Sequence, residues 1–155
     1  METIEPATLE DIPQLAELLN VLFREEGEFQ PDRKKQARAL GMIIDSADRG
    51  IIFVARDGSE VAGMVGLLPT ISTAEGGLAY WLEDLVVRPD RRGDGIGTRL
   101  LQHAIDYARA QGSSRITLLT GKKNTRAIQL YRRHGFTETT MTSLRLGLDA
   151  GSGTA

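Results

Sequence analysis

The sequence contains no cysteine, which excludes disulfide bonds, thiolate metal sites and a covalent cysteinyl intermediate. Histidine is also scarce. Only His103 and His134 are present, so we predict no metal site and assign neither residue a catalytic role. No apolar run approaches the length of a membrane span, and the acidic start of the chain lacks the basic segment of a secretion signal. We therefore expect a cytoplasmic protein with no membrane partner.

A strong charge of either sign is absent as well. The 19 lysines and arginines nearly balance the 21 aspartates and glutamates, giving a net charge of −2. Bulk nucleic-acid binding requires a basic surface, so we predict no nucleic-acid partner. The length of 155 residues and the hydrophobic fraction of 41% suit one globular domain. We expect that domain over residues 1–149 and a disordered tail over residues 150–155.

Hydrophobic periodicity predicts the order of the elements. Helical spacing indicates helices near residues 12–26, 31–49, 96–111 and 124–134. Short apolar or alternating runs indicate strands near residues 3–7, 51–55, 61–68, 78–88, 116–120 and 136–148. Asp57-Gly58 is a hairpin signal, and we expect residues 69–77 to form a loop or a ragged strand end. The fold class is therefore α+β (mixed α/β), with an antiparallel region in the middle of the chain.

Glycine is abundant, and three of the 17 glycines alternate between an expected strand and an expected helix, at positions 93, 95 and 97. Bare backbone can approach an anion closely, and the free N–H groups at a helix start favour phosphate. A simple tight turn is the alternative, but the flanking Arg91 and Arg92 favour phosphate binding. A Walker A loop is excluded because Gly97 is followed by Thr98 and Arg99. The Gly-x-Gly-x-Gly spacing after an antiparallel meander also disfavours a dinucleotide fingerprint.

Two segments of the chain match short motifs. The core of the first, Arg/Gln-x-x-Gly-x-Gly/Ala, is matched by Arg92, Gly95 and Gly97. The second, Asn-x-x-Ala-x-x-Leu-Tyr-x-x-x-Gly-Phe, is matched by Asn124, Ala127, Leu130, Tyr131, Gly135 and Phe136. In this order the two motifs resemble those of the GNAT superfamily of N-acetyltransferases, and the resemblance extends from about residue 51 to residue 148. It implies a single-domain GNAT-like fold, with a central, mostly antiparallel sheet of six to seven strands flanked by four helices.

The resemblance implies acetyl-coenzyme A (acetyl-CoA) as the co-substrate. In this family the glycine loop cradles the pyrophosphate, mainly through backbone N–H groups, and the preceding strand pairs with the pantetheine arm. Asn124 would bond the pantetheine, cap the next helix, or do both. The cofactor-binding residues implied are Leu85, Val86, Val87, Arg92, Gly93, Asp94, Gly95, Ile96, Gly97, Thr98, Asn124 and Tyr131.

Three residues are candidates for acid–base catalysis. Tyr131 would protonate the departing thiolate of coenzyme A, and its alternative is a tyrosine that only packs on its helix. Glu83 and Asp84 are neighbours on a strand and therefore face opposite sides, so one of them would point into the cleft. We favour Glu83 as the base, directly or through water, with Asp84 next. Either could instead bind the substrate or serve the structure. A backbone N–H near Leu85 would stabilise the oxyanion.

Two charged clusters lie outside the motifs. An acidic and aromatic cluster at the end of the first helix suits a cationic amine, and its alternative is an exposed helix end. It comprises Phe23, Glu25, Glu26, Glu28 and Phe29. A basic cluster could meet the 3′-phosphate of the cofactor or form a solvated face. It comprises Lys122, Lys123, Arg126, Arg132 and Arg133.

The sequence thus predicts an N-acetyltransferase that transfers the acetyl group of acetyl-CoA to a primary amine of a small molecule. Direct attack in a ternary complex is expected because a cysteinyl intermediate is impossible. A protein or peptide acetyltransferase acting on N-termini or lysines is the nearest alternative. A non-catalytic acyl-CoA-binding regulatory module is the alternative of another class. Dimers are common in the family, so a homodimer is possible, and the short segment after Phe136 could truncate the usual final hairpin.

Overall fold

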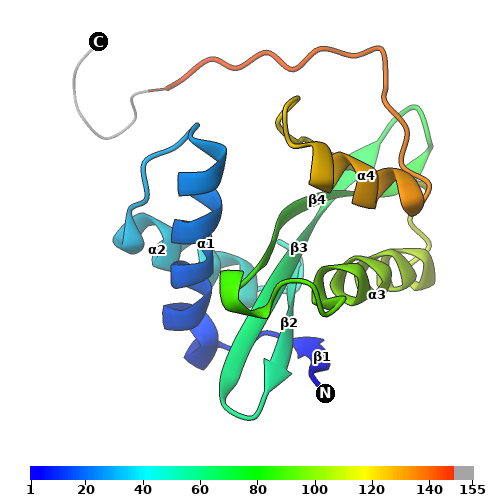
Figure 1. The fold of residues 1–155 in the computed structure, drawn as a ribbon. Helices are drawn as coiled ribbons and strands as arrows, with labels where there is room; N and C mark the ends of the chain where they lie inside the picture. Colours follow the sequence, from blue (N-terminus) through cyan, green and yellow to red (C-terminus); the bar gives the residue numbers. More distant parts are fainter. Residues whose placement is uncertain (149–155) are drawn as a thin grey trace.

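A computed structural model describes residues 1–148, so the predicted tail over residues 150–155 lies outside the described part. The fold is one sheet with helices on both faces (Figure 1). Its strands are β1 (Thr3–Pro6), β2 (Ile51–Asp57), β3 (Glu60–Ser72), β4 (Gly77–Val87) and β5 (Ile116–Leu118). The helices are α1 (Ile12–Glu26), α2 (Arg33–Ile44), α3 (Ile96–Ala110) and α4 (Thr125–Arg133), with 3-10 turns η1 (Leu9–Asp11) and η2 (Pro89–Arg91).

The sheet has the order β1-β2-β3-β4-β5. The first four strands are antiparallel to their neighbours, and only the β4–β5 pair is parallel. The mixed α/β class with four helices is therefore confirmed, as is the expectation of a mostly antiparallel sheet. The predicted number of six to seven strands is wrong for the described residues, which form five. None of the described helices is long and apolar enough to cross a membrane.

Two hydrophobic layers hold the helices on the sheet. On one face, Leu15, Leu19 and Leu40 of α1 and α2 pack against apolar side chains of β2 and β3. On the other face, α3 buries Leu100 and Leu101 against the sheet, and α4 packs beside it. The apolar periodicity of each helix selects the buried face, and burying these aliphatic side chains is the main stabilising contribution.

An ion pair fixes the start of α1 to the sheet. The Arg56 guanidinium on β2 donates through Nη1 and Nη2 to the two carboxylate oxygens of Asp11, at 2.9 and 2.8 Å. Asp11 is only 4% exposed and also accepts from the backbone N–H of Thr8. These donors hold the pKa of Asp11 below its ordinary value. The beginning of α1 is therefore anchored on β2, far from the end of α1 that reaches the cavity described below.

Strand β4 carries a bulge near the point where its pairing with β5 ends. Gly66 of β3 faces Glu83, but Met64 faces Val86, so two residues of β4 oppose one residue of β3. Asp84 lies in this bulge with φ of 58°, and it is the one non-glycine residue with positive φ among the described residues. On its other side β4 pairs with β5 only from Tyr80 to Leu82. Beyond Leu82 the two parallel strands separate, which leaves the last residues of β4 without a partner on that side.

The predicted strand over residues 136–148 is wrong. This segment forms no strand in the structure and runs as an extended chain from the end of α4 toward the end of α1 (Figure 1). Its alternating Leu144, Leu146 and Leu148 are 80–91% exposed. Alternation specifies two faces of an extended segment but not a partner strand, and β5 ends after three residues. By contrast, β3 is longer than predicted and continues to Ser72, so the expected loop is reduced to the tight turn before Gly77.

Candidate active site

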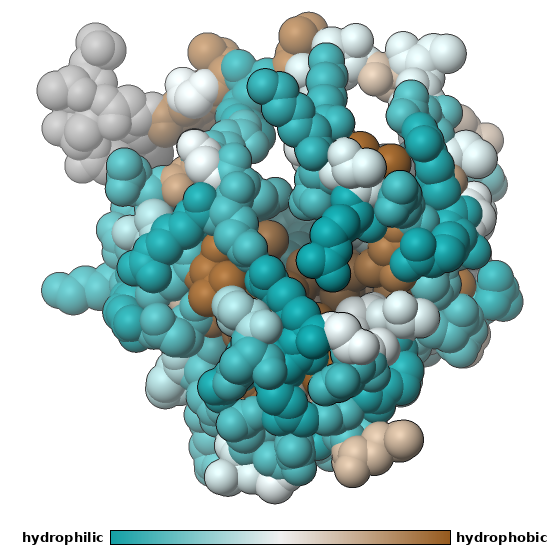
Figure 2. Space-filling view, in the orientation of Figure 1, coloured by the Kyte–Doolittle hydropathy of each residue, from teal (hydrophilic) through white to brown (hydrophobic). Residues whose placement is uncertain are grey.

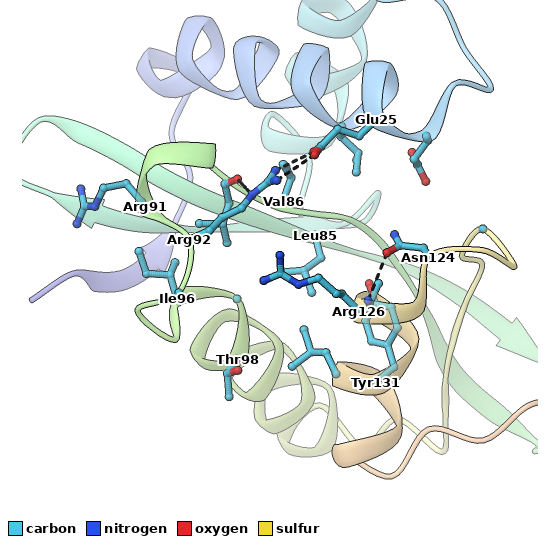
Figure 3. A pocket seen from close by; sticks show the side chains of 18 of the residues that line it. Glu25, Leu85, Val86, Arg91, Arg92, Ile96, Thr98, Asn124, Arg126 and Tyr131 are labelled. Atoms are coloured by element: carbon cyan, nitrogen blue, oxygen red, sulfur yellow. Dashed lines mark hydrogen bonds and ion pairs between the residues drawn. The ribbon is translucent and has the colours of Figure 1, made fainter.

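A cavity of about 810 Å³ opens between the end of α1, the end of β4, the glycine loop and α4. Figure 2 shows it as a hollow on this face of the molecule, with hydrophobic residues visible along its walls, and Figure 3 shows its lining from close by. Of the twelve predicted cofactor-binding residues, eleven line this cavity and Asp94 does not. Residues that sequence reasoning assigned to three separate elements are thus brought to one place.

The glycine loop presents the open start of a helix to this cavity. Gly93 and Gly95 have φ of 95° and 81°, a conformation that glycine adopts without strain. Helix α3 begins at Ile96, and no side chain caps it. The first intrahelical bond from this end runs from the N–H of Arg99 to the carbonyl of Gly95. The N–H groups of residues 96–98 therefore have no acceptor within the helix and are suited to an anion.

The two arginines before the loop do not point into this cradle. Arg91 turns away from the cavity and forms ion pairs with Glu60 at 2.6 Å, with Asp57 at 3.2 Å and with Glu2 (Figure 3). Arg92 turns toward α1 and donates to both carboxylate oxygens of Glu25, at 2.7 and 2.9 Å. The cradle for an anion is therefore made by backbone groups, while the flanking guanidinium groups fix the loop to other elements.

The free edge of β4 continues the same surface. Leu85, Val86 and Val87 all line the cavity, and they follow the point where β4 separates from β5. Val86 is 4% exposed, so its side chain belongs to the core while its backbone borders the cavity. Backbone groups on an unpaired strand edge can pair with an extended amide-containing chain. This arrangement fits the predicted pairing with a pantetheine arm, which stays a prediction.

Helix α4 supplies the opposite wall. The Asn124 side chain accepts a hydrogen bond from the N–H of Ala127 at 3.3 Å, so it caps the helix while it also lines the cavity. Lys123, Arg126 and Arg133 line the cavity too, and Figure 3 shows the Arg126 side chain extending into it. Part of the basic cluster identified in the sequence therefore faces the cavity, where it adds positive charge beside the open start of α3.

Tyr131 lies on α4 at the inner end of this wall. Its ring packs edge-on against Phe136, with ring centroids 5.7 Å apart. Burial, and next the negative charge of Glu26, raise the pKa of Tyr131 to about 12. The phenol therefore keeps its proton at neutral pH and can act as a hydrogen-bond donor or an acid in this cavity.

The two candidate bases occupy different surroundings. Glu83 is exposed, whereas Asp84 is half-buried in the bulge of β4. Burial raises the pKa of Asp84 to about 7, with further contributions from the charges of Glu83 and Glu26. The lining of the cavity within the described chain includes neither acid but does include Glu26. Glu26 and Tyr131 line the cavity, and Asp84 immediately precedes the lining residue Leu85. The charge of Glu26 acts on both Asp84 and Tyr131.

Sequence reasoning assigned no catalytic role to Glu26. It appeared only within the acidic and aromatic cluster, because nothing local shows that the end of α1 reaches β4 and α4. Glu26 is partly shielded from water, and this together with the charge of Glu28 raises its pKa. Glu25, Glu26 and Glu28 all line the cavity, and Phe23 packs edge-on against Phe29. The three acids of the predicted acidic and aromatic cluster therefore form a wall of the cavity, and its two aromatic residues pack against each other outside the lining.

Arg145 of the extended segment 137–148 contacts the acidic and aromatic cluster. Arg145 forms an ion pair with Glu28, and its guanidinium lies 5.2 Å from the centre of the Phe29 ring. Because successive side chains of an extended segment point to opposite sides, the flanking Leu144 and Leu146 point away from the rest of the protein. The acidic and aromatic cluster thus already holds one cationic group of the chain itself, by an ion pair and a cation–π contact.

Comparisons with known proteins identify the family. Residues 12–136 match the model of the acetyltransferase (GNAT) family. The YhfO protein of Bacillus subtilis, named an uncharacterized N-acetyltransferase, is 39% identical over 137 residues, which cover 88% of this chain and 91% of YhfO. An uncharacterized N-acetyltransferase of Methanocaldococcus jannaschii is 32% identical over 137 residues, and the match covers 88% of this chain but only 61% of that protein.

A solved structure described as a probable acetyltransferase superposes with a TM-score of 0.80 at 26% identity. The superposition covers 94% of this chain and 97% of the other. The family model thus spans both sequence motifs and all four helices, and the fold agrees with it. The chain belongs to the acetyltransferase (GNAT) family.

Proposed function

We propose that this protein is an N-acetyltransferase that transfers the acetyl group of acetyl-CoA to a primary amine of a small molecule. The observation that carries the proposal is the single cavity that joins three features. These are the open start of α3, the unpaired edge of β4, and the side chains of Glu26 and Tyr131, with Asp84 immediately before the lining residue Leu85. The first two features suit a phosphorylated amide-containing cofactor, and the third suits proton transfer.

The residues of the cavity fit acetyl-CoA in charge and in shape. The N–H groups of residues 96–98 would bind the pyrophosphate, and the backbone of residues 85–87 would pair with the pantetheine arm. Lys123, Arg126 and Arg133 would supply the positive charge that a 3′-phosphate requires. The carboxylates of Glu25, Glu26 and Glu28 lie on the α1 side, so the anionic cofactor and a cationic acceptor would occupy opposite parts of one cavity.

In the proposed reaction the cofactor contributes a thioester. The acceptor nitrogen forms the new C–N bond with the acetyl carbon, and the C–S bond breaks. Asp84 takes, through water, the first proton that the acceptor ammonium must lose, since its pKa of about 7 is close to neutral pH. Tyr131 gives its proton to the sulfur that leaves, and its high pKa keeps it protonated until then. The nitrogen loses its second proton to solvent as the amide forms, and solvent returns one proton to the Tyr131 phenolate. The same direct transfer is consistent with the lack of cysteine in the sequence.

We assign the role of the base to Asp84 rather than to Glu83. A useful base has a pKa near the working pH. Burial and two neighbouring acids give Asp84 such a pKa, while Glu83 is exposed. Asp84 does not itself line the cavity but immediately precedes Leu85, which does, so a water molecule would relay the proton. Glu83 then acts through its charge, as one of the groups that raise the pKa of Asp84.

A relative supports a small-molecule acceptor. The streptothricin acetyltransferase of Streptomyces lavendulae is 36% identical over 92 residues, which cover 59% of this chain and 46% of that enzyme. Its name specifies a small molecule. The acidic wall formed by Glu26 and Glu28, with Phe29 beside it, suits a cationic amine of this general kind.

Release of free coenzyme A thiol, measured with acetyl-CoA and a panel of small amines and peptides, tests the proposal. We expect turnover on at least one small cationic amine and none on peptides. Acetyl-CoA binding without turnover on any amine would overturn the enzymatic proposal in favour of a binding module. Faster turnover on peptides would assign a protein acceptor instead.

The Tyr131→Phe variant tests the assigned acid. It removes only the hydroxyl, so kcat should fall about 10- to 100-fold while the Kd of acetyl-CoA stays the same. Tyr107→Phe is the matched control, because Tyr107 packs against Phe53 and Tyr80 away from the cavity and should leave kcat unchanged. An unchanged kcat for Tyr131→Phe would remove the assigned role.

A further inference from the structure

One ion pair joins the two functional walls of the cavity. Arg92 belongs to the glycine loop, and its Nη1 and Nη2 atoms donate to the two carboxylate oxygens of Glu25 at the end of α1. Its Nε donates to the carbonyl of Val87 at the end of β4, at 3.1 Å. One guanidinium group therefore connects the glycine loop, β4 and α1 (Figure 3). The bidentate geometry fixes orientation as well as distance.

The end of α1 needs such a partner. Glu25 and Glu26 occupy its last turn, where the helix dipole is negative and carboxylates are unfavourable. Glu28 follows after Gly27, which ends the helix with φ of 74°. The Arg92 guanidinium offsets this negative charge, and it holds the pKa of Glu25 below its ordinary value. The contact therefore ties the last turn of α1 to the glycine loop and the end of β4.

Glu26 is the next residue along that turn, and it lines the same cavity as Tyr131 and as Leu85, the residue after Asp84. Its charge acts on both Asp84 and Tyr131. We propose that Glu25 is a positioning residue that, through Arg92, fixes Glu26 beside Asp84 and Tyr131 and so links the cofactor loop to the acceptor end of the cavity. This inference rests on the proposed function, because it assumes that the acceptor reacts beside Asp84. Glu25 itself touches no reacting atom in this arrangement.

A link of this kind has a thermodynamic consequence. A cofactor that orders the glycine loop also orders the last turn of α1 through Arg92, so it tightens the acceptor end. By reciprocity, an acceptor held by that end tightens cofactor binding. The side chains of Arg92 and Glu25 are 33% and 51% exposed, so the pair contributes little to global stability. The effect on function can therefore be separated from an effect on folding.

The Glu25→Gln variant removes the charge and keeps the shape. We expect kcat/KM for the acceptor amine to fall about tenfold, with the Kd of acetyl-CoA changed less than about twofold and the melting temperature nearly unchanged. The acid limb of the pH–rate profile should move to lower pH, because Glu26 would no longer be held near Asp84. Of the two acids that raise the pKa of Asp84, Glu83 stays in place and Glu26 moves.

Two further variants sharpen the test. Glu25→Asp keeps the charge and should restore much of the lost kcat/KM. Glu17→Gln is the matched control, since Glu17 lies on the same helix and pairs with Arg33 on the exposed side. It should leave every parameter unchanged. An unchanged kcat/KM and pH profile in Glu25→Gln would overturn the inference, as would a loss confined to acetyl-CoA affinity.

Hydrogen exchange separates this inference from the proposed function. The N–H of Gly27 donates to the carbonyl of Phe23 at 2.9 Å and reports on the last turn of α1. Adding acetyl-CoA should slow exchange over residues 23–27 in the unsubstituted protein but not in Glu25→Gln. If no amine is acetylated while this difference is present, the proposed function fails and the link stands. Equal slowing in both proteins would overturn the link whatever the activity.

Discussion

Replacing Asp84 with asparagine should stabilise the protein while inactivating it. Burial, with the charges of Glu83 and Glu26, raises the pKa of Asp84 from 3.8 to about 7 in the folded state. At 1.36 kcal/mol per pKa unit, the charged form is disfavoured by at most about 4 kcal/mol at neutral pH and above. Because part of the side chain reaches solvent, we expect a gain of about 1–2 kcal/mol for Asp84→Asn at pH 8.

The sign follows from proton linkage. The folded state keeps a proton on Asp84 that the unfolded state releases above its ordinary pKa, so this group favours folding at low pH. That contribution is complete below about pH 4 and is lost as pH rises to about 7, the pKa of the folded state. Asparagine does not titrate, so the advantage of the variant should appear across this window and be largest above it.

The choice of asparagine isolates the charge. Asp84 has φ of 58°, and asparagine tolerates this conformation nearly as well as aspartate does. Urea unfolding followed by circular dichroism at about pH 5 and about pH 8 gives the two free energies of unfolding. The neighbouring Glu83→Gln, which removes an exposed carboxylate, should gain less than half as much at pH 8. A variant that is equally destabilised at both pH values would refute the reasoning. Activity provides the second measurement, since kcat/KM should fall by about 100-fold or more on loss of the base.

Three other substitutions test the anchor, the loop and the basic wall. Arg56→Met leaves the buried Asp11 carboxylate without its bidentate partner. The free energy of unfolding measured in urea titrations should fall by about 2–4 kcal/mol, and a loss under about 0.5 kcal/mol would contradict this. Gly95→Ala should weaken acetyl-CoA binding about tenfold by calorimetry, whereas Gly58→Ala, with φ of 62° in a hairpin turn, should carry similar strain without weakening it. Arg126→Gln should weaken acetyl-CoA binding at least about threefold at low salt and less at high salt, because Arg126 lines the cavity. If the affinity for acetyl-CoA is independent of salt in the unsubstituted protein and in the variant, a contact between Arg126 and a phosphate of the cofactor is excluded.

Local patterns in the sequence were enough for the parts of the site that depend on the backbone. Gly93 and Gly95 form the predicted loop before a helix, and that helix begins at Ile96 without a side-chain cap. Asn124 begins α4, and Tyr131 follows it on the cavity side. These features are readable because each is fixed by residues within one turn or one helix. The prediction of a strand over residues 136–148 failed because a strand needs a partner from elsewhere in the chain. Alternating leucines do not show whether such a partner strand is available.

The sequence alone determined the family, the order of helices and strands up to α4, and the loop whose glycines and helix start suit a phosphate. Only the tertiary structure decided which acids meet at the acceptor end. The bulge in which Asp84 is half-buried depends on the register of β4 with β3. The charge of Glu26 acts on Asp84 and Tyr131 because α1 packs against β4. Likewise, Arg92 adjoins the predicted phosphate loop but bonds Glu25, 67 positions earlier. Such contacts are set by how helices pack on a twisted sheet, and no local pattern of residues encodes them.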